Sequence, residues 1–412
     1  MSGSCPHLLY VGDVPIESSY HGSALLYRLL ETYPTERLRV VETGSELSLP
    51  ERRLAGVDYR AWPLNGSRWL RSRFHRLARA KTAWDAHRSA HKAATVIEGF
   101  SAQAVLTVGH GAGWIAAAEI ARRLQVPLHF IVHDDWPRCG MFFPPAYRWI
   151  DRQFGRVYRQ AASRLCVSPA MRDVYAEMYG AAGSVLYPSR ARNCAEFDAP
   201  PARLAEPVAS PLCIYAGSIN SDGYVRQLRS LAAALLAVNG RLRIYGPAAP
   251  ADLARQGLDG TNVEMGGLLT STELIARCRR EADFLFVPLS FAPADRTAME
   301  RNFPSKLTDC TAMGLPLLVC GPSSCSGVRW GRDNPGAAIV VDTDDPVPLA
   351  EAVVRLAGDS GLRMSLAREA LRVGRMMFSF ETADAVFRAA IGQTSSSGVP
   401  VRSDVPPSYA SA

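Results

Sequence analysis

Candidate ligand-binding side chains are concentrated between residues 302 and 316, where the sequence reads NFPSKLTDCTAMGLP. Pro304 and Ser305 indicate a helix start, and Lys306 at that start suits a phosphate group. Asp309 follows one helical turn after Ser305 on the same face, where a carboxylate can accept hydrogen bonds from both hydroxyls of a ribose. The segment therefore indicates a nucleotide site. An ordinary capped helix, with Asp309 favouring the helix dipole, is the alternative.

Polar side chains also follow two apolar runs in the first half of the chain. His110 comes after the run 104–108, and His133 and Asp134 come directly after the run 128–132. A His–Asp pair can hydrogen-bond sugar hydroxyls, or the carboxylate can orient the imidazole. The spacing of these residues does not specify a metal, so we expect none. Capping of the following loop by His133 and Asp134 is the structural alternative.

Two glycines stand where the backbone could approach a ligand. Gly22 opens a helix after the loop that contains Asp13, and Gly217 and Ser218 follow a later apolar run. Helix starts near glycine suit a phosphate or another polar ligand, and Arg226 on the next helix could add positive charge. Relief of a tight turn is the alternative for Gly22, and solvent exposure is the alternative for Arg226. Neither site is a GxGxxG motif, so a dinucleotide is not indicated.

Strand-like and helix-like segments alternate along the chain, which predicts βαβ units and mostly parallel sheets. The alternation lapses at 188–211, which we interpret as a linker between two tandem doubly wound, Rossmann-like α/β domains at 1–187 and 212–377. Ligands of such sheets bind at the carboxyl ends of the strands, so we expect the site in the cleft between the domains. The last stretch, 393–412, is rich in Ser and Pro and is predicted to be a disordered tail.

The expected elements are as follows. Strands are predicted at 8–11, 38–41, 104–108, 128–132, 164–167, 212–216, 241–245, 263–265, 284–287, 316–319 and 337–341. Helices are predicted at 22–30, 68–99, 114–124, 143–162, 225–238, 250–256, 271–282, 305–313, 346–357, 361–373 and 382–391.

Composition limits the class of protein. The 412 residues are 48% apolar and 21% charged, which excludes a fibrous, coiled-coil or wholly disordered chain. No apolar run approaches the roughly 18 residues that cross a bilayer, and residues 1–7 lack the charged start of a signal peptide. The nine cysteines include no CxxC pair and indicate reduced thiols. We therefore expect a cytoplasmic protein.

Positive charge is concentrated between residues 68 and 92. Within a net charge of +7, this segment holds eight Lys and Arg residues and one acid, Asp85. Such a block favours an anionic partner such as a membrane surface or a phosphorylated ligand, and a solvated helix face is the alternative. Nucleic acid is not expected, because the segment lacks a recognised reading module. The apolar side chains expected to face inward are Trp69, Leu70, Phe74, Leu77, Ala78 and Trp84.

Taken in order, these segments resemble the GT-B glycosyltransferases, most closely the retaining family 4 group. The resemblance covers nearly all of residues 7–391 and rests on segments 108–111, 127–134, 185–188, 215–218, 304–316 and 378–380. The last of these resembles the family's return to the first domain, so a helix at 378–392 is expected to cross back. The resemblance also implies that the second domain holds a nucleotide-sugar donor and the first domain holds the acceptor.

The resemblance implies a role for each matching residue. Such enzymes need no metal or other cofactor, and retention is thought to use front-face attack assisted by the departing phosphate. The expected catalytic residues are His133, Asp134 and Lys306. The expected donor-binding residues are Gly217, Ser218, Arg226, Pro304, Ser305, Lys306, Leu307 and Asp309. The expected acceptor-binding residues are Asp13, Gly22 and His110.

The chain departs from the family pattern at two places. Family members usually carry two glutamates eight positions apart, and here those positions are Arg301 and Asp309. Where a Lys-Gly is common after the second-domain glycine, the chain has Ser-Asp-Gly at 221–223. The cations that could compensate are Arg190, Arg226 and Lys306.

These residues favour a sugar transferase that builds a cell-envelope polysaccharide or glycolipid from a UDP- or GDP-sugar. The segment 68–92 would then approach an anionic membrane, on its inner face, that carries a lipid-linked acceptor. A nucleotide-sugar epimerase is one alternative, with its acid and base drawn from His110, His133, Asp134 and Asp135. A non-catalytic, nucleotide-binding partner subunit is the other. The sequence leaves open the nucleotide, the sugar, the acceptor and the oligomeric state.

Overall fold

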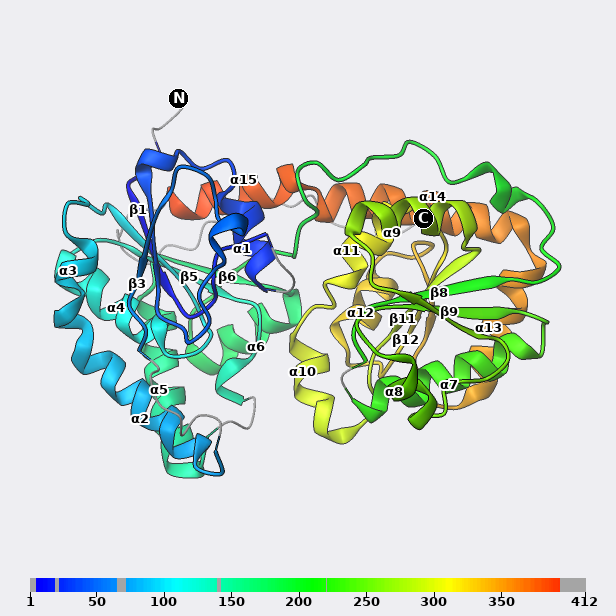
Figure 1. Cartoon of the computed structure of the whole chain (residues 1–412), viewed down its shortest axis with the longest axis horizontal. Coiled ribbons are helices and arrows are strands. Elements are labelled where there is room, and N and C mark those ends of the chain that lie inside the picture. The colour runs from blue at the N-terminus through cyan, green and yellow to red at the C-terminus, as the bar shows by residue number, and fades with distance from the viewer. Residues whose placement is uncertain (1–4, 19–21, 65–71, 139–141, 220, 393–412) are drawn as a thin grey trace.

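Two parallel β-sheets, each covered by helices, form two domains that lie side by side (Figure 1). The computed structural model describes residues 5–18, 22–64, 72–138, 142–219 and 221–392. The strands are runs of buried apolar residues because both faces of each sheet are covered, as parallel sheets require. The expected α/β class, with two doubly wound domains in tandem, is confirmed.

The first sheet has the strand order β3-β2-β1-β4-β5-β6-β7, all parallel. Its strands are β1 (Leu8–Gly12), β2 (Leu38–Glu42), β3 (Asp58–Ala61), β4 (Ala104–Val108), β5 (Leu128–Val132), β6 (Ser163–Cys166) and β7 (Ser184–Val185). Its helices are α1 (Gly22–Leu30), α2 (His75–Ser89), α3 (Ala94–Ile97), α4 (Gly113–Leu124), α5 (Pro144–Gln160) and α6 (Pro169–Tyr179). The strand order reverses between β1 and β4, and such a switch point opens a crevice at the carboxyl ends of the strands.

The second sheet repeats this plan with the order β10-β9-β8-β11-β12-β13. Its strands are β8 (Leu212–Ala216), β9 (Arg241–Tyr245), β10 (Val263–Gly267), β11 (Phe284–Pro288), β12 (Leu317–Cys320) and β13 (Ile339–Val341). The helices are α7 (Asp222–Leu236), α8 (Pro250–Arg255), α9 (Ser271–Glu281), α10 (Arg296–Arg301), α11 (Lys306–Ala312), α12 (Ser326–Asp333), α13 (Pro346–Gly358) and α14 (Ser360–Phe378).

A final helix, α15 (Phe380–Ile391), continues from α14 and lies on the first domain (Figure 1). Ser379 separates the two helices, and its hydroxyl caps α15 by accepting a hydrogen bond from the Thr382 amide at 3.2 Å. Phe387 and Ile391 are buried in the same apolar cluster as Leu8 of β1. The end of the described chain is therefore part of the core of the first domain.

Several sequence expectations about local structure are wrong. The segment 68–99 is not one helix: α2 ends at Ser89, a 3₁₀ turn follows, and α3 is short. Phe74, Leu77 and Trp84 are 42%, 52% and 50% exposed and do not face the core, whereas Ala78 is buried. The large apolar side chains do not mark the buried face, because α2 packs through small ones such as Ala78, Ala83 and Ala86. Residues 68–71, which include Trp69 and Leu70, and the predicted tail 393–412 lie outside the described residues.

Sequence reasoning also missed the short elements β3, β7, α6, α10 and α12. Among these, α6 could have been predicted, because Ser168 and Pro169 are typical of a helix start: Ser168 caps the helix and Pro169 occupies its first turn. The Ser168 hydroxyl accepts a hydrogen bond from the Met171 amide at 3.0 Å. The two-residue strand β7 and the six-residue helix α10 are too short to show a period in the sequence.

Candidate functional site

The carboxyl ends of the first-domain strands bring three predicted residues to one edge of the sheet. Asp13 follows β1, His110 follows β4 and His133 follows β5. Gly22 at the start of α1 faces His133, since a Cβ atom built on Gly22 would lie 3.1 Å from Cε1 of the imidazole. Glycine therefore lets α1 approach this ring closely. Burial lowers the pKa of His133, the charge of Asp134 opposes that shift and His110 adds to it.

Asp13 is occupied by structural hydrogen bonds. Its carboxylate accepts from the backbone amides of Ala112 at 2.8 Å and Gly113 at 3.0 Å, and also from the Thr43 hydroxyl. A carboxylate at the first turn of α4 satisfies amides that have no partner within the helix. Both oxygens of Asp13 therefore hold the start of α4 and the residue after β2 in place, and acceptor binding by Asp13 stays a prediction.

On the second domain, Lys306 and Gly217 lie against each other. Gly217 has φ +144°, and a Cβ atom built on it would lie 2.3 Å from Cε of Lys306. The Lys306 ammonium donates a hydrogen bond to the Tyr215 hydroxyl at 2.6 Å, and it lies 5.2 Å from the ring centre of Tyr224. Burial lowers the pKa of Lys306 to about 8. Among the described residues, no carboxylate forms an ion pair with Lys306, so its charge is available to an anionic ligand.

Asp309 lies one turn further along α11, near Arg190, which the sequence offered as a compensating cation, and Arg28, which it did not. Burial raises the pKa of Asp309, and the charges of Arg28 on α1 and Arg190 in the linker oppose this shift. The Arg190 guanidinium is buried and donates to the Thr308 carbonyl at 3.2 Å and to the Thr311 hydroxyl at 3.1 Å. Arg190 therefore anchors α11 to the linker.

The remaining donor-side predictions differ in their surroundings. Ser305 is exposed in front of α11, and Pro304 is half-buried and packs on Gly327. Leu307 is fully buried in the core, so its side chain packs the domain and presents no surface to a donor, contrary to expectation. Arg226 is exposed on α7, so Lys306, and not Arg226, is the cation beside Gly217. Ser218 borders a pocket of ≈ 300 Å³ whose other lining residues are Ile219, Pro247, Ala248, Asp252, Arg255 and Gln256.

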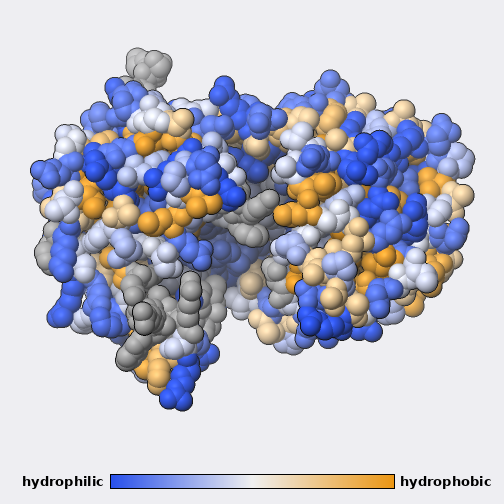
Figure 2. Space-filling model, in the orientation of Figure 1, coloured by the Kyte–Doolittle hydropathy of each residue, from blue (hydrophilic) through white to orange (hydrophobic). Residues whose placement is uncertain are grey.

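Contacts across the two domains join the two halves of the predicted site. The Asn302 amide nitrogen donates to the Asp134 carboxylate at 3.0 Å, and the Asp135 backbone amide donates to the Asn302 side-chain oxygen at 3.1 Å. Arg301 and Asp135 form an ion pair. The Ser168 hydroxyl donates to the Arg301 carbonyl at 2.6 Å. Figure 2 shows the surface hollowed between the two domains.

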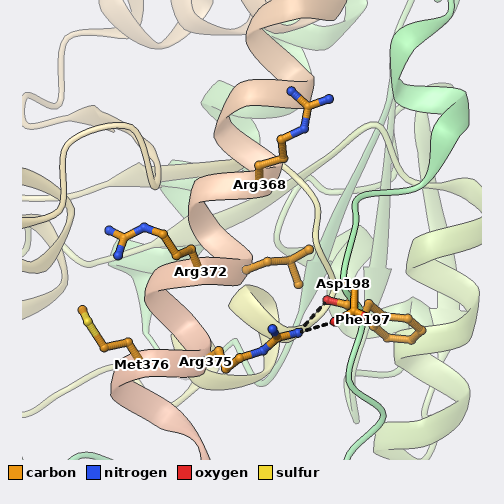
Figure 3. Close-up of a pocket in the computed structure, with 7 residues that line it drawn as sticks. Phe197, Asp198, Arg368, Arg372, Arg375 and Met376 are labelled. Atoms are coloured by element: carbon orange, nitrogen blue, oxygen red, sulfur yellow. Dashed lines mark hydrogen bonds and ion pairs between the residues drawn. The ribbon is translucent and has the colours of Figure 1, made fainter.

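A second pocket, of ≈ 370 Å³, lies between α14 and the linker (Figure 3). It is lined by Phe197, Asp198, Arg368, Leu371, Arg372, Arg375 and Met376, none of which is a predicted site residue. Arg375 donates to the Asp198 carboxylate at 3.1 Å and to the Phe197 carbonyl at 3.2 Å, which fixes the linker against α14.

Two further findings concern metals and membranes. Within the described ranges, no group of three or more His, Cys, Asp or Glu side chains is arranged to hold a metal ion. In the same part of the chain, no helix is both long enough and apolar enough to span a bilayer.

Sequence reasoning missed the aromatic and interdomain partners of the site. Tyr215 lies in the predicted strand 212–216 and Tyr224 lies just before the predicted helix 225–238, and nothing in the sequence pairs either of them with Lys306. Arg301 read as a charge reversal inside the donor site, and its pairing with Asp135 of the first domain depends on how the two domains are placed. The adjacent Asp134-Asp135 and Arg301-Asn302 pairs are the only signal in the sequence that could have suggested this contact.

Solved structures of other proteins share the fold of this chain over most of its length. Residues 37–188 match the family model of Glycosyltransferase Family 4. No curated protein matches the sequence significantly. HepE (Alr3699) of Anabaena, solved with UDP and glucose, superposes with a TM-score of 0.65 at 15% identity over 94% of this chain and 99% of that chain.

Two other solved structures have a similar fold. For α,α-trehalose 6-phosphate synthase from Burkholderia multivorans the TM-score is 0.63 at 15% identity, over 94% of this chain and 96% of that chain. For the lipopolysaccharide outer core galactosyltransferase WaaB, in its apo form, it is 0.60 at 15% identity, over 93% and 99%.

Proposed function

We propose that this chain, which has the GT-B fold and resembles the family 4 glycosyltransferases, transfers a sugar from a nucleotide-sugar to an acceptor with retention of configuration. The proposed donor is a UDP- or GDP-sugar, and UDP is favoured because the similar HepE structures contain UDP or UDP-glucose. The proposed acceptor is a carbohydrate or a lipid-linked sugar of cell-envelope polysaccharide or glycolipid synthesis.

The observation that carries this proposal is the half-buried ammonium of Lys306 beside Gly217, which forms no ion pair with a carboxylate of the described residues. A desolvated cation attracts a diphosphate more strongly than an exposed one, because water screens its charge less. The positive-φ glycine leaves the backbone uncovered, so a ligand can approach it closely. Lys306 would stabilise the charge that develops on the leaving diphosphate, with no metal required for that step.

The other residues have roles that follow from their positions. Asp309 would accept hydrogen bonds from the ribose hydroxyls. His133, held mostly neutral by burial, would lie beside the transferred sugar and donate or accept a hydrogen bond there. Asp134 is oriented by Asn302 from the second domain, so its carboxylate would contact a sugar hydroxyl or the attacking acceptor. Front-face attack assisted by the departing phosphate would then need no second carboxylate.

We also propose that α2 and the residues before it meet an anionic membrane surface from the inner face. The helix presents Arg76 and Arg88 together with the exposed apolar side chains of Leu77 and Trp84, and the exposed Arg73 lies in the turn before it. Basic residues interleaved with exposed aromatic and aliphatic side chains are typical of helices that lie in the headgroup region. A lipid-linked acceptor would thereby be presented to the first domain.

The test of the donor site is a thermal-shift panel of UDP-, GDP-, ADP- and TDP-sugars, without metal, on wild type and Asp309→Ala. A ligand at about 100 times its Kd adds about 2.7 kcal/mol to the free energy of unfolding, which raises Tm measurably. We expect a shift with one nucleotide that is lost in Asp309→Ala. No shift with any sugar nucleotide would contradict the proposal, and release of an isomerised donor without acceptor would identify an epimerase instead.

A further inference from the structure

The carboxylate of Asp135 is a buried junction between the two domains. Asp135 is 3% exposed, and it accepts hydrogen bonds from the Tyr175 hydroxyl at 2.7 Å and from Arg138 at 2.9 Å, both in its own domain. It also pairs with Arg301 of the second domain. A buried carboxylate is tolerated only where cations and hydrogen bonds replace its hydration.

Arg301 depends on this contact more than Asp135 does. Arg138 also pairs with Asp151 at 2.6 Å, so the first domain retains a neutralised cluster around Asp135 when Arg301 is absent. Arg301 has a mostly buried side chain, and its Nε atom has no hydrogen-bond partner among the described residues. If the domains separate, Arg301 becomes exposed to water, and the Asp135 carboxylate keeps Arg138 as its counter-ion. The pair can therefore form and break reversibly.

The pair also stands at a particular place in the sequence. Arg301 precedes Lys306 by one short loop, and Asp135 follows His133 by two residues. The next residue on one side and the preceding residue on the other form a second contact, from the amide of Asn302, at the end of α10, to the Asp134 carboxylate at 3.0 Å. Contacts 135–301 and 134–302 thus tie the loop that carries His133 directly to the loop that leads into α11 and Lys306.

We propose that Asp135 and Arg301 are positioning residues that hold His133 and Asp134 of the first domain opposite Lys306 of the second. This inference rests on the proposed transferase function, in which the two loops supply opposite sides of one reaction centre. The charge reversal at position 301 then replaces an expected donor contact with an interdomain contact. Arg301 acts through domain alignment and does not contact the donor.

The test compares Arg301→Gln, Arg301→Lys and the matched control Arg296→Gln. Arg296 lies on the same helix, and its guanidinium pairs with Glu300 of that helix at 2.8 Å, so its loss removes a charge from α10 without touching the first domain. Interdomain distances are measured by spin labels on α4 and α13 of the full chain, with and without UDP. Turnover with the UDP-sugar that binds is measured on the same variants.

We expect Arg301→Gln to broaden the interdomain distances toward a more open population and to lower kcat by about tenfold or more, since tenfold corresponds to the loss of one modest interaction. The dissociation constant for UDP should stay within about twofold, because Lys306 and Asp309 are intact. Arg301→Lys should restore part of kcat, and Arg296→Gln should match wild type.

Two outcomes would overturn the proposal. One is an unchanged distance distribution in Arg301→Gln, which shows that the pair does not hold the domains. The other is a UDP affinity that Arg301→Gln weakens by much more than twofold, which identifies Arg301 as a donor contact. The distance measurement needs no substrate, so it decides the inference even if no sugar nucleotide binds. Asp135→Asn is a second probe, and its effect on kcat should not add to that of Arg301→Gln.

Discussion

The ammonium nitrogen of Lys306 lies 2.6 Å from the Tyr215 hydroxyl oxygen and 4.4 Å from the centre of the Tyr215 ring. The ring face offers weak negative potential, and the hydroxyl offers one neutral acceptor, so the ammonium is held in place without being neutralised. Burial in this setting lowers the pKa of the amine to about 8. The site therefore holds a positioned cation whose charge changes within an accessible pH range.

Affinity for UDP should fall as pH rises through about 8. Only the protonated amine attracts the diphosphate, and a lowered pKa means that the proton is lost at lower pH than from an exposed lysine. Bound phosphate favours the protonated amine of Lys306, so at saturating UDP the loss of the proton occurs at a higher pH. Titration calorimetry between about pH 7 and 10 measures this, since the reference lysine pKa is about 10.4.

Two variants control that experiment. Lys306→Arg keeps its charge throughout and should show a flat profile, while Lys306→Met should bind UDP at least about tenfold more weakly at neutral pH. A wild-type affinity that is independent of pH would show that Lys306 does not contact the phosphates.

Replacing Gly217 with Ala should both destabilise the second domain and weaken donor binding. The new methyl group would occupy the position of the Lys306 side chain, and a φ of +144° is strained for any residue with a Cβ. We expect a loss of about 1–3 kcal/mol in the free energy of unfolding, measured by urea denaturation. Gly358→Ala is the matched control, because a Cβ there meets nothing within 4 Å. Equal stability of the two variants would contradict the close contact between Gly217 and Lys306.

Turnover should depend on a neutral His133. Burial lowers its pKa, so the acid limb of the kcat profile should lie below the ordinary histidine value of about 6.5. His133→Ala should lower kcat strongly and leave the affinity for UDP nearly unchanged, because the imidazole belongs to the opposite domain. A parallel loss of UDP affinity would show that His133 contacts the nucleotide and not the transferred sugar.

Neutralising the basic segment should weaken membrane binding. Replacement of Arg71, Arg73, Arg76 and Arg79 by Gln removes four charges from the segment that ends in α2, of which Arg71 lies outside the described residues. Each basic residue near an anionic surface contributes about 1 kcal/mol, so sedimentation with vesicles rich in phosphatidylglycerol should drop. The control removes four exposed charges from the second domain, at Arg229, Arg277, Arg280 and Arg368. Equal sedimentation of both variants would show that the segment does not dock on the membrane.

The sequence alone determined the fold class and the order of most of the long elements. Buried parallel strands such as LLYVG and AVLTV are continuous apolar runs, which are local patterns that can be read directly. The same locality identified Lys306, Asp309 and His133 as candidates, because each follows or opens such an element. It did not show that the Asp13 carboxylate accepts hydrogen bonds from the amides at the start of α4, nor that Leu307 faces the core.

Tertiary structure decided which of these residues meet. Tyr215 and Lys306 are 91 residues apart, and Asp135 and Arg301 are 166 residues apart, so neither pair leaves a periodic signal in the sequence. The sequence shows the type and local position of a charge, but its partner depends on how two independently folded sheets are placed. For that reason the sequence shows Arg301 as a charge that departs from the family pattern. The structure shows that Arg301 forms an ion pair with Asp135 of the other domain.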